Sequence, residues 1–304
     1  MRLRKGTRVL DRGDGALQIG TRPGLVLRGL SASQRAFLER LETSTKVTAL
    51  QQQRHGDLLT TLAEAELLEP PPPPPLTLAL GDAGPIGLSL GLSAVRDGWA
   101  VRFVDEGPIE HAPAGTYSTG VIAARRQGAA CATVRSQVPL ARVSAGVGPA
   151  DVWVVVSHGA PGLDAALPLM SRDVPHVFIS VDEKGARIGP FVEPGASACG
   201  WCDALARTDA DAAWPRLALQ LSAPRPTAPV TSADVIAGAT GLVLGALGAW
   251  RRAEQSGWHN VAWLLTPCQP YARETVLPHP LCGCGATGPV GDDLAARRAR
   301  LPQA

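Results

Sequence analysis

The chain has 304 residues, of which 45% are hydrophobic and 18% are charged, and its formal net charge is +2. This composition is typical of a globular protein that buries a full core, in one large domain or in two. A charge this close to neutral, with the arginines scattered along the chain, argues against a dedicated nucleic-acid binder.

Two segments of the sequence bear on the cellular location that we expect for the protein. The basic start, MRLRKGTRVLDRGDG, leads into alternating residues and not into a long apolar stretch, so we expect no signal peptide. The most apolar run, Val235–Trp250, is short for a bilayer and rich in small residues, which favours a packed core helix. We therefore expect a cytoplasmic protein with no membrane partner.

Residues 1–69 predict a small module of three strands followed by three helices. The strands are expected at 7–12, 16–21 and 24–30. The first two flank Gly13-Asp14-Gly15, a hairpin signal. Ser31 or Ser33 can cap a helix that reaches Leu41, and further helices are expected at 48–53 and 57–68. This order predicts a winged helix-turn-helix-like module.

Six consecutive prolines, Pro70 to Pro75, follow this module. Such a run cannot continue a helix and favours a stiff, extended spacer. We therefore expect a domain boundary here, with the second domain at 76–304.

The second domain predicts strands that alternate with helices. A buried strand at 76–80 leads through a glycine turn into a helix and then into a second strand that ends at Asp105. Further strands are expected at 151–157 and, as a pair, at 176–192, with a helix at 162–172 between them. This alternation is typical of an α/β, Rossmann-like fold with a mainly parallel, doubly wound sheet.

Four of the six cysteines form two tight pairs, Cys199 with Cys202 and Cys282 with Cys284. Zinc prefers four ligands in a tetrahedron, and four thiolates leave no open position, so the pattern predicts a structural zinc site. Two alternatives stay open, a redox dithiol in CGWC and buried thiols without metal. His279 is a further candidate ligand, although a structural role beside the ligands or as a capping residue is favoured.

The turn Gly81–Gly87, GDAGPIG, resembles a dinucleotide fingerprint only in part. Gly84 and Gly87 match it, but Asp82 occupies the place of the first glycine, where an acid would repel a pyrophosphate. Asp105 lies at the usual ribose-binding position. The turn thus supports the fold more than it supports a bound nucleotide, and we expect no ATP.

The segments GPFVEPGASACGWCDALARTDADAAWPRLALQL and HPLCGCG carry a family resemblance. From Leu76 to Cys284 the chain resembles the ThiF-like, ubiquitin-activating superfamily, and more narrowly the cyclodehydratase-associated ThiF-like proteins of thiazole/oxazole-modified peptide (bacteriocin) clusters. The head segment GDGALQIGTRPGLVLRGL is similar to the peptide-recognition module of the same proteins. The resemblance covers about nine-tenths of the chain.

The resemblance implies different roles in different branches of the superfamily. Active members bind ATP and adenylate a C-terminal carboxylate, with an Asn-x-x-Arg element, a lysine and a later aspartate. Here 106–120 has no Asn-Arg pair, Arg125 and Arg126 stand where the lysine is expected, and Ser157-His158 replaces the acid. These departures fit the cyclodehydratase-associated branch, whose members bind a precursor's leader peptide and deliver it to a YcaO-type enzyme. The superfamily also often forms homodimers through this domain.

The leader is expected to add as a strand along Leu25, Val26 and Leu27, because an edge strand offers unpaired amides. Leu58, Leu59 and Leu62 of the third helix are candidates for the floor of an adjoining groove, or they simply pack the core. Two other functions remain open: an active adenylating enzyme with a rearranged pocket, and a winged-helix nucleic-acid binder.

Overall fold

The computed structural model describes residues 2–21, 24–43, 47–69, 75–109, 115–118, 125–223, 231–252 and 257–286. The chain divides into two compact units, Met1–Pro73 and Pro74–Ala304, which we call the head and the body. Of the proline run only Pro75 is among the described residues, and the Arg-rich end of the chain lies outside them.

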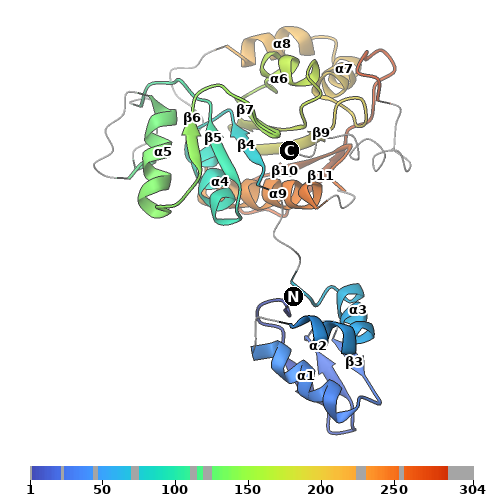
Figure 1. The fold of residues 1–304 in the computed structure, drawn as a ribbon. Coiled ribbons are helices and arrows are strands. Elements are labelled where there is room, and N and C mark those ends of the chain that lie inside the picture. Colours follow the sequence, from blue (N-terminus) through green and yellow to red (C-terminus); the bar gives the residue numbers. More distant parts are fainter. Residues whose placement is uncertain are drawn as a thin grey trace. The chain divides into compact units, whose positions relative to one another are not determined.

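The head has the expected order of three strands and then three helices (Figure 1). Its antiparallel sheet has the order β1-β2-β3, made of β1 Val9–Asp11, β2 Leu17–Ile19 and β3 Leu25–Leu27. The helices are α1 Ala32–Thr43, α2 Ala49–Arg54 and α3 Gly56–Glu64. Ser31 caps α1, since its Oγ accepts a hydrogen bond from the Gln34 N–H at 3.2 Å while Gln34 Oε1 accepts from the Ser31 N–H at 2.9 Å.

The head closes on itself around one apolar core. Buried side chains from the sheet and from two helices meet there, namely Leu17, Ile19, Phe37, Leu38, Leu41, Leu58, Leu59 and Leu62. The two ends of the head pair as a short antiparallel bridge, in which Arg4 N–H donates to Leu67 O at 2.9 Å and Glu69 N–H donates to Arg2 O at 2.8 Å. Because both ends are bonded within the head, this unit has the contacts of an independent folding unit.

The body is built on an eight-stranded sheet with the order β11-β10-β9-β8-β7-β4-β5-β6. The strands are β4 Thr77–Leu80, β5 Ala100–Phe103, β6 Val143–Ala145, β7 Val152–His158, β8 His176–Asp182, β9 Gly185–Val192, β10 Val261–Leu265 and β11 Ala272–Thr275. The pairs among β6, β5, β4, β7 and β8 are parallel, whereas β9, β10 and β11 are added antiparallel. The predicted pair at 176–192 is confirmed as β8 and β9. The sheet is thus parallel from β6 to β8 and antiparallel from β8 to β11.

Helices cover both faces of this sheet (Figure 1). They are α4 Pro85–Arg96, α5 Arg126–Gln137, α6 Leu163–Met170, α7 Gly200–Ala210, α8 Trp214–Leu221 and α9 Ala233–Arg251. The first core joins the sheet to α4, α5 and α9, and a second core joins it to α6 and α7. Burial on both faces explains why the central strands are mostly apolar and do not alternate.

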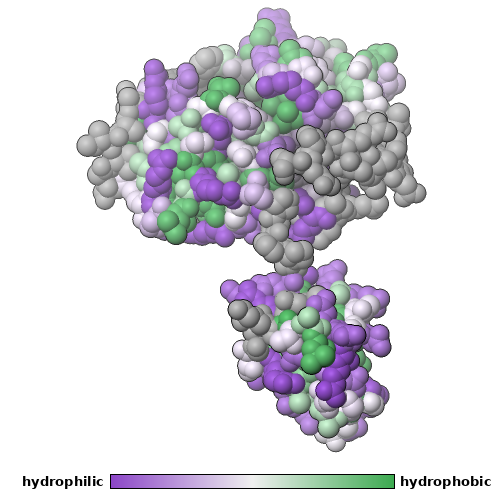
Figure 2. Space-filling model, in the orientation of Figure 1, coloured by the Kyte–Doolittle hydropathy of each residue, from purple (hydrophilic) through white to green (hydrophobic). Residues whose placement is uncertain are grey.

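Helix α9 is, in the described part of the chain, the one helix long and apolar enough to cross a membrane. Here it packs against α4, β9 and β10, and its Thr240 hydroxyl bonds the Ser89 hydroxyl of α4 at 3.0 Å. This packing is that of a core helix. Figure 2 shows hydrophobic and hydrophilic residues intermixed on the visible face of each unit.

Candidate functional site

The four paired cysteines meet in the body. Their sulfur atoms all lie within 4.8 Å of one another. The Sγ–Sγ distances are 3.8 Å for Cys199–Cys202, 3.6 Å for Cys199–Cys282 and 3.6 Å for Cys202–Cys284. Four sulfurs bonded to a central zinc ion at about 2.3 Å would lie about 3.8 Å apart, which is the edge of that tetrahedron. All four thiols are free, and the cluster is positioned to bind a metal ion.

Two structural devices bring the pairs together. Cys199 is the N-cap of α7, so the first pair sits on the helix N-terminus, whose dipole favours thiolates. Gly200 lets this turn approach the sheet, because a Cβ there would lie 2.7 Å from both Leu163 and Phe178. The second pair is held by His279, which bonds Asp209 of α7 at 2.8 Å. His279 thus supports the loop and lies outside the cluster of four.

The environment of the sulfurs favours ionised cysteine at one position. A hydrogen bond from the Cys199 thiol lowers the pKa of Cys202 to about 4, and the backbone N–H of His279 acts in the same direction. Donating that hydrogen bond raises the pKa of Cys199, and burial raises the pKa of Cys282 to about 11. Repulsion between neighbouring thiolates limits how many of these four thiols ionise without a cation. A cation at the centre would relieve that repulsion.

A buried ion network ties α7 to the antiparallel end of the sheet. Arg187 of β9 donates to Asp203 at 2.9 Å and to Glu274 of β11 at 2.9 Å, and Arg207 donates to Asp203 at 3.2 Å. Asp203 directly follows Cys202 in α7. Sequence reasoning missed the two Arg187 pairs, because charged residues 16 and 87 positions apart give no local signal.

The glycine turn after β4 is filled by its own aspartate. Asp82 Oδ2 accepts a hydrogen bond from the Gly87 N–H at 3.0 Å, and the Asp82 side chain is buried at the N-terminus of α4. Burial raises the pKa of Asp82, against the lowering effect of the Gly84 and Gly87 N–H groups. Gly87 is required by this close approach, since a Cβ there would lie 2.1 Å from the Asp82 carbonyl oxygen. The Asp82 side chain thus takes an amide that a phosphate would use.

The other predicted nucleotide residue, Asp105, is also satisfied internally. Its Oδ2 accepts from the Ala83 N–H at 2.9 Å, and its Oδ1 accepts from the Gly107 N–H at 2.9 Å and from Arg126 at 3.0 Å. The Tyr117 hydroxyl donates to the Ala83 carbonyl at 3.1 Å. Gly84, Gly87 and Asp105 therefore lie around one turn, and the polar groups described here are bonded to the chain itself.

The two edges of the head sheet differ. In an antiparallel pair, hydrogen-bonded and non-hydrogen-bonded positions alternate. The Gly20 N–H donates to Arg8 O and the Arg12 N–H donates to Ala16 O, so Gln18 also faces β1. Its neighbours Leu17 and Ile19 then face β3, where they oppose Leu27 and Leu25.

This alternation turns the Val26 N–H and C=O away from β2, toward the open edge. Among the described residues no hydrogen bond reaches these groups, and the Val26 side chain is 40% exposed. On the opposite edge, Glu42 of α1 accepts from the Val9 N–H at 3.2 Å and pairs with Arg8 at 2.6 Å. The β1 edge is therefore blocked by a side chain, whereas the β3 edge is available for an added strand.

The groove proposed for the third helix needs correction. Leu58, Leu59 and Leu62 are 6%, 4% and 0% exposed, and they pack in the core of the head. The apolar spacing of α3 was predicted correctly, but spacing alone does not distinguish a groove floor from a core face. Of the predicted peptide-binding residues, only those of β3 are accessible.

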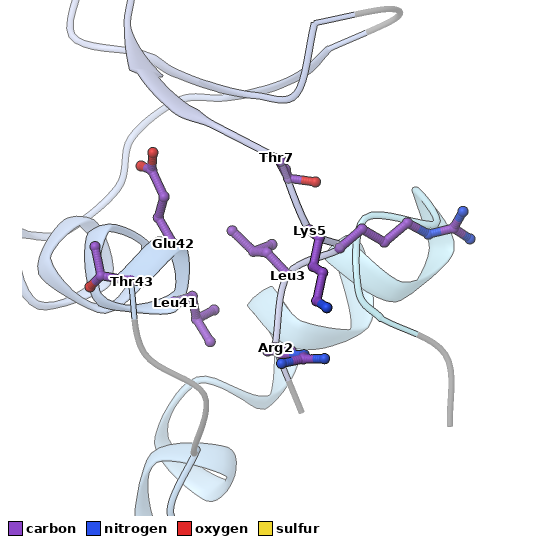
Figure 3. Close-up of a pocket in the computed structure, with 9 residues that line it drawn as sticks. Arg2, Leu3, Lys5, Thr7, Leu41, Glu42 and Thr43 are labelled. Carbon is purple, nitrogen blue, oxygen red and sulfur yellow. The ribbon is translucent and has the colours of Figure 1, made fainter. Parts of the chain in front are cut away.

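A hollow of about 220 Å³ lies elsewhere on the head, between the N-terminal segment and the end of α1 (Figure 3). Its lining includes Arg2, Arg4, Lys5 and Glu42. Arg2 pairs with Glu69, Arg4 with Glu66 at 3.7 Å, and Glu42 with Arg8. Because most of its charges are already matched, the hollow has little unpaired charge to offer a ligand.

Comparisons by sequence give no relative: no protein-family model and no curated protein matches the chain significantly.

Comparisons by structure do find relatives. Escherichia coli MccB is 12% identical with a TM-score of 0.60, over 95% of this chain and 98% of MccB. The Microcin C7 biosynthetic enzyme MccB in complex with N-formylated MccA is 12% identical with a TM-score of 0.61, over 94% of this chain and 99% of MccB. The heterocyclase TruD gives 14% and 0.53, over 94% of this chain but 42% of TruD.

The shared feature is the fold, and at these identities the likeness shows the fold alone. The same fold occurs in a microcin C7 biosynthetic enzyme that was captured with N-formylated MccA, and in proteins described as heterocyclases. This chain spans about two fifths of the heterocyclase chains.

Proposed function

We propose that the chain is a non-catalytic partner protein that binds the leader of a ribosomal precursor peptide. It presents that precursor to a YcaO-type cyclodehydratase, which forms azolines from Cys, Ser or Thr residues. The winged helix-turn-helix-like head is the leader-binding part in this proposal, and the body is a ThiF-like scaffold held by structural zinc. The free thiols support a reducing, cytoplasmic setting.

The observation that carries the proposal is the open edge of β3. An extended peptide binds a sheet edge through its main chain, so the edge must have free, outward-facing amide groups. Val26 supplies an N–H and a C=O of this kind, and the opposite edge is blocked by Glu42. MccB, which shares this fold, has been captured with the peptide MccA, and this supports a peptide as ligand here.

The filled glycine turn supports the non-catalytic part of the proposal. Adenylation needs cationic and amide groups free to hold phosphates. Here Asp82 takes the Gly87 amide of α4, and Arg126 is paired with Asp105.

An active ATP-dependent adenylyltransferase acting on a peptide or carrier C-terminus is the second candidate. MccB, described as a biosynthetic enzyme, was captured with AMPCPP, and that observation favours this candidate. It requires that Asp82 leave the turn when a nucleotide enters.

Two measurements on purified full-length protein separate the candidates. Isothermal titration with a precursor peptide encoded beside the gene should show binding without nucleotide, whereas ATP·Mg should give no heat and no peptide-dependent pyrophosphate exchange. Robust exchange in the absence of a partner enzyme would favour the adenylyltransferase.

Residues 2–69, whose two ends are bonded to each other, should bind the same peptide within about threefold of the full chain. Binding by the body alone would refute the assignment of roles.

A further inference from the structure

The open edge of β3 presents two different surfaces to a partner strand. Arg28 directly follows β3 and is exposed, as is Val26 two positions earlier. Since side chains alternate across a strand, these two lie on the same, outer face of the sheet. Leu25 and Leu27 lie on the inner face and pack partly against the core. An added strand would therefore meet a cationic, solvent-facing side and an apolar inner side.

The Arg28 guanidinium has donors to spare. Its Nη1 lies 3.0 Å from Asp14 Oδ2, and the two side chains are 65% and 43% exposed. A guanidinium carries five N–H donors, and an exposed pair of this kind contributes little to stability. Arg12, which bonds Gln18 at 2.7 Å on the same face, adds a second positive charge nearby. A carboxylate from a partner can thus reach Arg28 without disturbing the core.

The register of the sheet places that carboxylate. An antiparallel strand would continue the pattern of the head sheet and is slightly more stable than a parallel one. The partner residue opposite Val26 would exchange both main-chain hydrogen bonds with it. The partner residue one position earlier then lies opposite Leu27, and the residue two positions earlier lies beside Arg28.

We infer that the head selects an acidic, extended segment with the order acid, apolar, aliphatic, apolar. The aliphatic residue is the one opposite Val26, the two apolar residues face Leu27 and Leu25, and the acid pairs with Arg28. This inference rests on the proposed function, because it takes strand addition to β3 as its starting point.

The test uses the full chain and three short fluorescein-labelled synthetic peptides in one Gly/Ser-rich host. Their cores are Asp-Leu-Val-Leu, Asn-Leu-Val-Leu and the reversed Leu-Val-Leu-Asp. Fluorescence anisotropy at low salt should show the Asp peptide binding about fivefold more tightly than the Asn peptide, as an exposed charge pair allows. The reversed peptide should bind no better than the Asn peptide. The preference should shrink at high salt, because exposed charges are screened.

The variant Arg28→Gln should bind the Asp and Asn peptides equally, with the affinity that the wild type has for the Asn peptide. Arg54→Gln is the matched control, since Arg54 is an exposed arginine on α2, and it should keep the preference. Circular dichroism establishes that both variants are folded. Equal binding of the two peptides by the wild type, a preference that survives in Arg28→Gln, or tighter binding of the reversed peptide would overturn this inference and leave strand addition intact. Failure of every peptide to bind the folded protein would overturn strand addition as well.

Discussion

The cysteine cluster and the glycine turn lie in the same body, and both are recognisable in the sequence as ligand sites. They differ in whether their polar groups already have partners. The four sulfurs converge at the spacing of a metal tetrahedron, while the Gly87 amide of α4 is bonded to Asp82. A motif can bind only if its groups are unsatisfied in the folded chain, because a ligand must otherwise displace an internal partner.

The head repeats this contrast on its two sheet edges. Both β1 and β3 are edge strands, but Glu42 bonds the Val9 N–H on one side, and the Val26 main chain faces outward on the other. Substitutions at groups with and without an internal partner therefore test whether that partner decides which groups can bind a ligand.

The largest effect is expected at the cysteine cluster. Cys202→Ser should release the metal and unfold much of the body, because structural zinc contributes roughly 10–16 kcal/mol of apparent binding energy in small zinc domains. Elemental analysis should find one zinc per chain in the wild type, and thermal unfolding should show the loss of stability. Cys268→Ser is the matched control, since Cys268 is exposed and outside the cluster. Folded, reduced wild-type protein without zinc would contradict the proposed site.

The next largest effect concerns the corrected role of α3. Leu62→Ala should lower the free energy of unfolding of the head by about 2–5 kcal/mol, because it leaves a cavity in a closed core. Denaturant titration of residues 2–69 measures this. A change below about 0.5 kcal/mol, combined with lost peptide binding, would return Leu62 to a binding groove.

A smaller effect is expected at the open edge. Val26→Pro should weaken peptide binding about tenfold, because proline removes the outward N–H donor and leaves a peptide carbonyl unpaired. Val26→Ala keeps that donor and should bind within about threefold of the wild type. Isothermal titration measures both, after circular dichroism has verified the fold. Equal weakening by both variants would mean that the side chain, and not the main chain, makes the contact.

The smallest effect is expected at Asp82. Its pKa in the folded chain is raised by burial, so the fold binds this proton more tightly than the unfolded chain does. The stability of the wild type relative to Asp82→Asn should therefore increase as the pH falls through the raised pKa toward 3.8, the ordinary value. Parallel denaturation curves of the two proteins at pH 7 and pH 4.5 measure this difference. A difference that falls with acidification would mean that Asp82 is stabilised as the carboxylate.

Much of the architecture could be predicted because it is encoded locally. The alternation of strands with helices, the Ser31 cap and the paired cysteines all depend on residues within a few positions of one another. The antiparallel addition of β10 to β9 is different, since β10 begins 69 residues after the end of β9 and nothing local announces their pairing.

The sequence by itself determined which groups exist: four thiols in two pairs, an aspartate in place of a glycine, and a short strand with alternating leucines. Tertiary structure decided which of these groups are left without partners. It brought the two cysteine pairs within bonding distance of one centre, bonded Asp82 to the Gly87 amide of α4, and buried Leu62 while leaving Val26 at an open edge. The physical reason is that hydrogen bonding and burial depend on contacts between residues distant in the chain, and only the folded chain brings those residues together.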